Sequence, residues 1–277
     1  MRLFRSHLNE PWLWMAEYWL ANAMYGLAEV DVTKVRSILQ KLKSQNNNNN
    51  DDITPEREQC RKKANNISFT AYLVACLARA VEHEPRVQAY KIGRNKQVIF
   101  KDVHVSTMIE PSDDEGGVAI PHVLRNADQR SVQDLSDEIY AVKGDPELSE
   151  QKSGKFAKVA TKIPRWLRMF FFRWMMSNPE AIETNCGTIM LTSIGMMVGK
   201  GRGGWCVPHL PLHTVGVTVG GIHKKPAVLE DGSIEPREFV CLTIAFDHDI
   251  VDGAPAARFS SHFIELIESG SLLKEEG

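Results

Sequence analysis

A histidine, an aspartate and a glycine lie close together near the end of the sequence, as His248, Asp252 and Gly253. Residues 239–246, just before them, are apolar and β-branched, which predicts a buried strand. From Ala254 onward apolar residues recur at helical spacing, which predicts a helix. A histidine at the end of a rigid strand can act as a general base. The glycine permits a sharp turn there, and the aspartate can order the loop.

The run from His248 to Gly253, HDIVDG, resembles the HxxxDG signature of the chloramphenicol acetyltransferase and dihydrolipoamide acyltransferase superfamily. The longer match, through Phe259, is most similar to the acyltransferase cores of 2-oxoacid dehydrogenase complexes. Those cores usually carry Arg after the histidine, where this chain has Asp249. The resemblance implies that His248 is the catalytic base. It also implies that Asp252 fixes the loop through an ion pair, whose arginine partner the sequence does not identify.

A second segment of the resemblance contains a hydroxyl group. Residues 186–195 form a β-rich run that ends in Gly195 and resembles the family pattern G-T-F-x-I-S-N-L-G. The alignment places Thr192 at the hydroxyl position and Ser193 where Asn is usual. Threonine can replace serine in this role, since either side chain donates one hydrogen bond to an oxyanion. The resemblance therefore implies that Thr192 stabilises the tetrahedral intermediate.

The resemblance extends over most of the chain, from about Glu29 to Leu266. Within it, Ser131 is expected to cap a helix that runs through Val142, and His213 falls where the family has Gln. The matching segments are residues 29–33 followed by a helix over 34–43, residues 85–89, residues 117–123, residues 126–131 and residues 208–222.

Three side chains are expected to contact substrate: Ser193, His213 and Trp205. His213 could line the channel of the acceptor thiol, although packing is the alternative. Trp205 follows the glycine-rich residues 199–204, which lack the strand-then-helix context of a dinucleotide site and are expected to form a surface loop.

The resemblance implies an α+β fold of the chloramphenicol acetyltransferase-like type, a two-layer sandwich with a mixed β-sheet and helices on one face. We expect residues 1–277 to form a single catalytic domain, because a chain of this length can bury one large core. Members of the family form trimers in which the histidine of one subunit faces the hydroxyl strand of its neighbour. A homotrimer with its active site at the subunit interface is therefore expected.

Two segments stand apart from the family pattern. Residues 44–66 contain five consecutive asparagines and are expected to form a flexible loop. Residues 153–179 form an aromatic, Met-rich and basic insert. Three roles remain open for the insert: packing over the core or at a subunit contact, covering a hydrophobic acyl pocket, or resting on a membrane surface.

Charge, cysteine spacing and apolar runs limit which binding partners and which cellular compartment we expect. A formal net charge of -2 gives no reason to expect nucleic acid as a partner. The five scattered cysteines show no metal-binding spacing, so we expect reduced thiols, no bound metal and a cytoplasmic protein. We expect no transmembrane segment, because no run reaches about 20 apolar residues. An organellar presequence stays open, since Arg2 and Arg5 precede the first acidic residue.

The resemblance implies an acyltransferase that uses a coenzyme A thioester as substrate. The acyl group would pass to a thiol, alcohol or amine, carried by a small molecule or a carrier protein, since no lipoyl attachment site is expected in this sequence. A competing hypothesis is a homologue that transfers no acyl group, acting as an oligomeric scaffold or as a pocket that binds or cyclises a biosynthetic intermediate. Asp249 and Ser193, which replace the usual Arg and Asn, keep this alternative open.

Overall fold

The computed structural model describes residues 22–47, 67–92, 96–111, 119–149, 177–195, 203–207 and 213–273, together with residues 164, 167, 170, 173–175 and 201. Its main feature is a six-stranded sheet in the order β1-β8-β7-β6-β4-β5. The strand β6 runs parallel to both of its neighbours, and every other pair is antiparallel, so the sheet is mixed. The strands are β1 (Ala23–Asp31), β4 (Val105–Ile109), β5 (Ile120–Leu124), β6 (Ile189–Ser193), β7 (Val215–Val228) and β8 (Ile234–Asp247).

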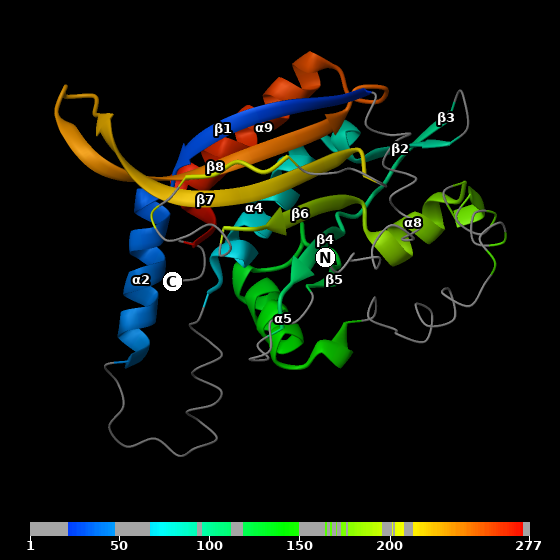
Figure 1. The fold of residues 1–277 in the computed structure, drawn as a ribbon, viewed down its shortest axis with the longest axis horizontal. Helices are drawn as coiled ribbons and strands as arrows, with labels where there is room; N and C mark the ends of the chain where they lie inside the picture. The colour runs from blue at the N-terminus through cyan, green and yellow to red at the C-terminus, as the bar shows by residue number, and fades with distance from the viewer. Residues whose placement is uncertain are drawn as a thin grey trace, which may run out of the picture.

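The main helices pack on one face of this sheet (Figure 1). They are α2 (Thr33–Asn47), α4 (Phe69–His83), α5 (Val132–Gly144) and α9 (Gly253–Ser269). Alternate residues of β8, such as Leu242 and Phe246, pack against Phe259 and Phe263 of α9 in the buried core. We call the opposite side of the sheet its outer face. The predicted α+β sandwich with helices on one face is confirmed.

Smaller elements complete the described part. The strands β2 (Ala89–Ile92) and β3 (Lys96–Ile99) form a separate hairpin, and the short helix α8 (Pro179–Cys186) leads into β6. Single 3-10 turns occur at Pro85–Gln88, Pro146–Leu148 and Ser271–Leu273. Among the described helices, none is both long enough and apolar enough to cross a membrane.

Local side-chain bonds explain where two helices begin. The carboxylate of Asp31 accepts the N–H of Thr33 at 2.9 Å, at the start of α2. The hydroxyl of Ser131 accepts the N–H of Asp134 at 3.0 Å, which confirms Ser131 as the N-cap of α5. The helix α9 ends at Gly270, whose φ of 65° is a left-handed conformation that glycine adopts without strain.

Two boundaries differ from the sequence prediction. The helix α2 continues to Asn47, so the expected loop over residues 44–66 begins four residues too early, and residues 48–66 lie outside the described part. The apolar pattern of residues 87–91 predicts a strand, but residues 87–88 belong to the 3-10 turn that Pro85 begins. Proline fixes φ near -65°, which suits the first residue of such a turn.

The insert at residues 153–179 lies mostly outside the described residues. Of the residues that are described, Phe170 and Trp174 are 68% and 54% exposed, whereas Met175 is buried beside Tyr90, Phe100 and Ile182. This small cluster joins the end of the insert to α8 and to the β2–β3 hairpin. The described end of the insert therefore packs on the domain.

Candidate active site

The turn that carries His248 is organised by the residue before it. The carboxylate of Asp247 accepts the N–H of Asp249 at 3.0 Å, and its carbonyl oxygen accepts the N–H groups of Ile250 and Val251. The N–H of Asp247 itself donates to the carbonyl of Thr214, at the start of β7. These bonds close a tight turn directly at the end of β8. The exposed His248 ring therefore projects from a rigid frame.

Contacts from two other elements hold the same turn. The N–H of His248 donates to the carbonyl of Asn22 at 2.9 Å, and the side-chain amide of Asn22 donates to Asp249 at 2.8 Å. The Lys91 ammonium, on β2, lies 3.3 Å from the other oxygen of Asp249. Asp249, which stands where the family usually has Arg, thus joins the turn to β1 and to the hairpin.

Burial raises the pKa of Asp247, and the adjacent Asp249 carboxylate acts in the same direction. The hydrogen bond from the N–H of Asp249 and the positive charge of Lys91 oppose this rise. Ionisation of the Asp247 carboxyl group, which organises the turn, therefore costs free energy. The N–H of Asp249 and the Lys91 ammonium reduce this cost.

Asp252 begins the helix that follows the turn. It is the N-cap residue of α9, its carbonyl oxygen accepts the N–H of Ala256, and its side chain makes no capping bond. Within the described residues Asp252 has no ion-pair partner, and Arg258 of α9 pairs with Glu84, at 3.1 and 3.0 Å. The ion pair expected of Asp252 therefore stays a prediction, and among the described residues the side-chain bond within the turn comes from Asp247.

Thr192 is the first member of a row of threonines across three neighbouring strands. It is paired with Thr218 on β7, which is paired with Thr243 on β8. All three lie on the outer face, because their strand neighbours, such as Leu191 and Leu242, belong to the core under the helices. Among the described residues, the buried hydroxyls of Thr218 and Thr243 have no hydrogen-bond partner. Both share the outer face of the sheet with Thr192.

Thr192 and the His248 turn are far apart within one chain. The register places Thr192 two strands away from Thr243, which precedes Asp247 by four residues. With about 4.8 Å between strands and about 3.3 Å per residue, the separation is about 16 Å. A hydrogen-bonded reacting group cannot span this distance. The two candidate catalytic groups of one chain therefore do not meet.

The three expected substrate contacts lie in different surroundings. Ser193, half-buried at the end of β6, lies opposite Val219. Trp205 is 44% exposed, in a segment whose Gly204 carbonyl accepts the N–H of Gly221 on β7.

His213 is buried, with its Nε2 at 2.9 Å from the carbonyl of Cys186, and its Nδ1 has no partner among the described residues. Burial lowers the pKa of His213, although the bond to the Cys186 carbonyl opposes this shift. The ring is therefore held neutral, and its contact with the end of α8 supports a packing role. His104 and His122 are likewise buried within hydrogen-bond networks of their own.

The catalytic-domain model described as "2-oxoacid dehydrogenases acyltransferase (catalytic domain)" matches residues 15–147 and 178–274. The chain belongs to this family. The match passes over residues 148–177, which overlap the insert that the sequence analysis sets apart. Both the turn of His248 and the strand of Thr192 lie inside the matched acyltransferase regions.

Curated relatives of this acyltransferase domain are components of larger proteins. The chain is 24% identical over 210 residues to the dihydrolipoyllysine-residue acetyltransferase component of the pyruvate dehydrogenase complex of Bacillus subtilis, covering 76% of this chain and 40% of that protein. The corresponding protein of Staphylococcus aureus strain Mu50 is 24% identical over 224 residues, covering 80% of this chain and 43% of its own length. The chain thus spans about two fifths of the curated relatives it matches.

Solved structures of similar proteins share the fold. A probable dihydrolipoamide acetyltransferase from Listeria monocytogenes 4b F2365 has a TM-score of 0.64 at 18% identity, with 97% of this chain and 93% of that chain covered. The dihydrolipoamide acetyltransferase of Azotobacter vinelandii has a TM-score of 0.62 at 17% identity, with 94% and 87% covered.

Two features of this acyltransferase domain could not be found from the sequence. The sequence places Thr218 and Thr243 in strands, but only the register shows that they form a row with Thr192. Asp249 was noted as a departure, but its contact with Lys91 joins residues that are 158 positions apart. A possible signal was the alternation of threonines with valines and leucines on both strands.

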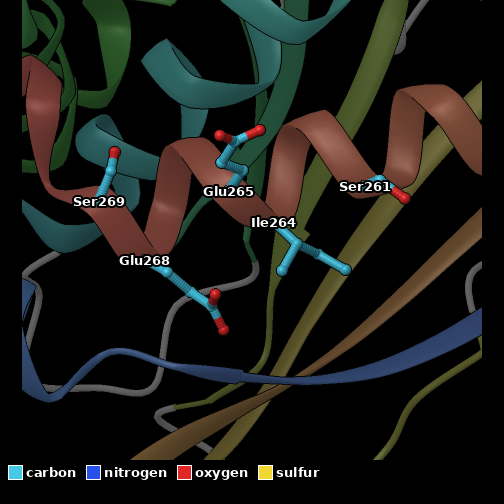
Figure 2. A pocket seen from close by; sticks show the side chains of 5 residues that line it. All are labelled: Ser261, Ile264, Glu265, Glu268 and Ser269. Atoms are coloured by element: carbon cyan, nitrogen blue, oxygen red, sulfur yellow. The ribbon is translucent and has the colours of Figure 1, made fainter. Parts of the chain in front are cut away.

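A surface hollow lined by residues of α9 takes no part in this site. Figure 2 shows that its lining comes from the single helix α9, with Ser261, Ile264 and Glu265 followed by Glu268 and Ser269. Glu268 accepts the N–H of Asp31 at 3.3 Å, so this carboxylate already ties α9 to β1. A shallow surface on one helix lacks the converging walls of a substrate site.

Proposed function

We propose that this chain catalyses transfer of an acyl group between a coenzyme A thioester and an acceptor thiol, with His248 as general base and Thr192 as oxyanion donor. The observation that carries the proposal is the rigid turn at the end of β8, which presents an exposed imidazole from a frame of backbone bonds. Membership of the acyltransferase family supplies the reaction class.

The chemistry follows from the two groups. His248, in its neutral form, takes the proton of the acceptor thiol as its sulfur attacks the thioester carbonyl carbon. Negative charge then develops on the carbonyl oxygen, where the Thr192 hydroxyl donates a hydrogen bond. Collapse of the tetrahedral intermediate breaks the carbon–sulfur bond to coenzyme A, and the imidazolium returns its proton to the leaving thiolate. An alcohol or amine acceptor would use the same proton path.

The active site of this proposal is shared between subunits. Since Thr192 and the His248 turn of one chain are about 16 Å apart, the reacting pair must come from two protomers. A cyclic homotrimer would repeat the same contact three times. Thr218 and Thr243, which continue the row of Thr192 on the outer face, would then lie beside the bound thioester.

The named relatives favour a dihydrolipoyl acceptor. Two of them are dihydrolipoyllysine-residue acetyltransferase components of pyruvate dehydrogenase complexes. The structural study of the Azotobacter protein concerns the role of a serine, a histidine and an asparagine in its catalytic mechanism, with the asparagine four residues after the histidine. Asp252 stands four residues after His248 here, which supports a role of this position near the reacting groups.

The direct test is a transfer assay. Purified chain is incubated with acetyl-CoA and dihydrolipoamide, and free coenzyme A and the acetylated product are followed by mass spectrometry. We expect both products in equal amounts. Absence of transfer with dihydrolipoamide and with a panel of thiols, alcohols, amines and longer acyl-CoA donors would reject the proposal and favour the homologue that transfers no acyl group.

A mixing experiment tests the shared site separately. The variants His248→Ala and Thr192→Val are each inactive in the proposal, but a trimer containing both has one intact pairing. Dissociation and reassembly at equal amounts should restore about a quarter of the wild-type activity, because about three quarters of the trimers are mixed and each has one good site in three. Recovery of no activity in confirmed mixed trimers would contradict the shared site.

A further inference from the structure

Three side chains that can bind a metal ion meet on the outer face of the sheet, away from the His248 turn. Glu29 on β1 and Cys241 on β8 are direct cross-strand partners. His223 comes from β7, the next strand. His223 and Cys241 are 18 positions apart along the chain, and Glu29 lies in a strand much earlier in the sequence. The expectation of no bound metal rests on residue spacing along the sequence. Spacing cannot reveal a set of ligands that three different strands bring together.

A β-bulge brings His223 to this face. The register of β7 shifts between Val219 and Ile222. Val217 and Val219 point into the core before the bulge, and Ile222 packs against the core after it. Without the extra residue, the alternation would place His223 on the core side. The bulge therefore turns the imidazole toward Cys241 and Glu29.

The donor atoms of the three residues are close enough to bind one metal ion. The Nε2 of His223 lies 3.3 Å from an Oε1 of Glu29, and its Nδ1 lies 3.9 Å from the Sγ of Cys241. One donor atom from each residue lies within 4.8 Å of the others. Cys241 is 1% exposed, whereas the side chains of His223 and Glu29 are 18% and 35% exposed. The sulfur is thus the most buried of the three ligands and the carboxylate the most exposed, so an ion can reach the group from solvent on the side of Glu29.

We propose that Glu29, His223 and Cys241 bind a zinc ion, with a water molecule as the fourth ligand. Thiolate, imidazole and carboxylate are the three ligand types that Zn²⁺ takes in proteins, and three protein ligands leave a tetrahedral site with one open position. Binding releases the thiol proton of Cys241 to solvent, because the thiolate is the ligand. An ion takes one nitrogen of the ring, so the carboxylate or the ring turns slightly to meet it.

Lys225 holds the place of the cation when no ion is bound. Its ammonium contacts the second oxygen of Glu29 and lies 4.3 Å from the centre of the Phe239 ring. The Lys225 ammonium thus already pairs with the carboxylate that the proposal assigns to zinc. Zinc and this ammonium compete for Glu29, and the flexible lysine can move into solvent when the ion binds.

Gly203 leaves room for the imidazole. A Cβ atom at Gly203 would lie 2.8 Å from the Nδ1 of His223, closer than packed atoms allow. The neighbouring Gly204 carbonyl accepts the N–H of Gly221, which anchors the segment over β7. The segment 203–204 therefore fixes the ring from above, and only glycine at 203 leaves the ring in place.

The test is a zinc titration of metal-free protein against a chromophoric chelator, repeated with Co²⁺ as a spectroscopic probe. We expect one ion per chain and an ultraviolet charge-transfer band from thiolate to Co²⁺. Cys241→Ser should remove the band, and His223→Gln should weaken zinc binding roughly tenfold or more. Lys225→Met should tighten zinc binding, because it removes the competing cation. Cys206→Ser is the matched control, since Cys206 lies outside the group and is partly exposed.

Each outcome decides the proposal. Equal zinc affinity of the wild type and Cys241→Ser, absence of binding at one equivalent, or weaker binding by Lys225→Met would each overturn it. Thermal melting of every variant without zinc serves as the folding control, and a rise in Tm on adding zinc should occur only where the three ligands are intact. None of these readouts depends on acyl transfer, so they stand whether or not the proposed function holds.

Discussion

The backbone N–H of His248 donates to the carbonyl oxygen of Asn22 at 2.9 Å, which ties the candidate base to the first described residue before β1. The Asn22 side chain then bonds Asp249, and Asp249 contacts Lys91. Three elements distant in sequence thus fix one turn. This arrangement replaces the arginine that the family usually has after the histidine.

Lys91→Met and Asp249→Asn should each lower kcat a few-fold, with little change in KM, because the imidazole loses part of its support. The pair is partly exposed, so a double-mutant cycle on stability should give a coupling of about 0.2–1 kcal/mol. Lys101→Met, an exposed lysine elsewhere, is the control and should leave kcat unchanged. Additive effects of the two changes on kcat would contradict a joint role.

His248→Ala should lower kcat by about 10²–10⁴, the usual contribution of a general base. The ring is exposed, so Tm should stay close to that of the wild type. The measurement is coenzyme A release at saturating substrates, with circular dichroism as the folding check. His83→Ala, an exposed histidine at the end of α4, is the matched control. Full turnover by His248→Ala would show that another group is the base.

Thr192→Val should lower kcat by about 10²–10³ and leave KM nearly unchanged, because the lost hydrogen bond forms in the transition state. Thr192→Ser keeps the donor and should retain most of the activity. Comparing kcat of the two variants separates the effect of the hydroxyl group from the effect of side-chain volume. Equal losses in both would assign the effect to packing instead.

Thr218→Val should raise stability while lowering transfer. A buried hydroxyl without a partner costs about 1–3 kcal/mol, and valine removes that cost. If the hydroxyl faces the bound thioester, its loss also weakens substrate binding or catalysis. Thr107→Val is the control, since the Thr107 hydroxyl is also unpartnered but shares its face of β4 with Val105 and Ile109 of the core. Urea unfolding and steady-state kinetics measure the two effects, and an unaltered kcat/KM in Thr218→Val would exclude this threonine from the site.

His213 should make stability depend on pH. Burial lowers its folded pKa, so below the ordinary value of about 6.5 the unfolded chain binds more protons than the folded one. The contribution of His213 to the free energy of unfolding is therefore fully present above about pH 6.5. It is lost as the pH drops from about 6.5 toward the folded pKa. His213→Gln should flatten this part of the curve, as measured by urea unfolding at several pH values. A difference between the two proteins that does not vary with pH would contradict this assignment.

The elements of this fold follow from local sequence signals. The apolar residues 239–246 form the buried part of β8, and Ser131 caps α5 as its type predicts. Motif spacing also indicated the strand of Thr192 and the turn of His248.

Contacts between distant segments were beyond the sequence. Lys91 and Asp249 meet because a hairpin folds beside the end of β8, and no local pattern records this contact. The bulge that turns His223 outward depends on one extra residue in β7, whose glycines fit either face. The ion pair expected of Asp252 stays a prediction, because no partner for it lies among the described residues. A loop aspartate can be ordered by its own backbone, as Asp247 shows.

The separation between Thr192 and the turn after β8 has a kinetic consequence. Under the proposed function, a protomer with its base and its oxyanion donor at opposite corners holds no complete site. Specific activity should therefore fall when the protein is diluted below the dissociation constant of its subunits.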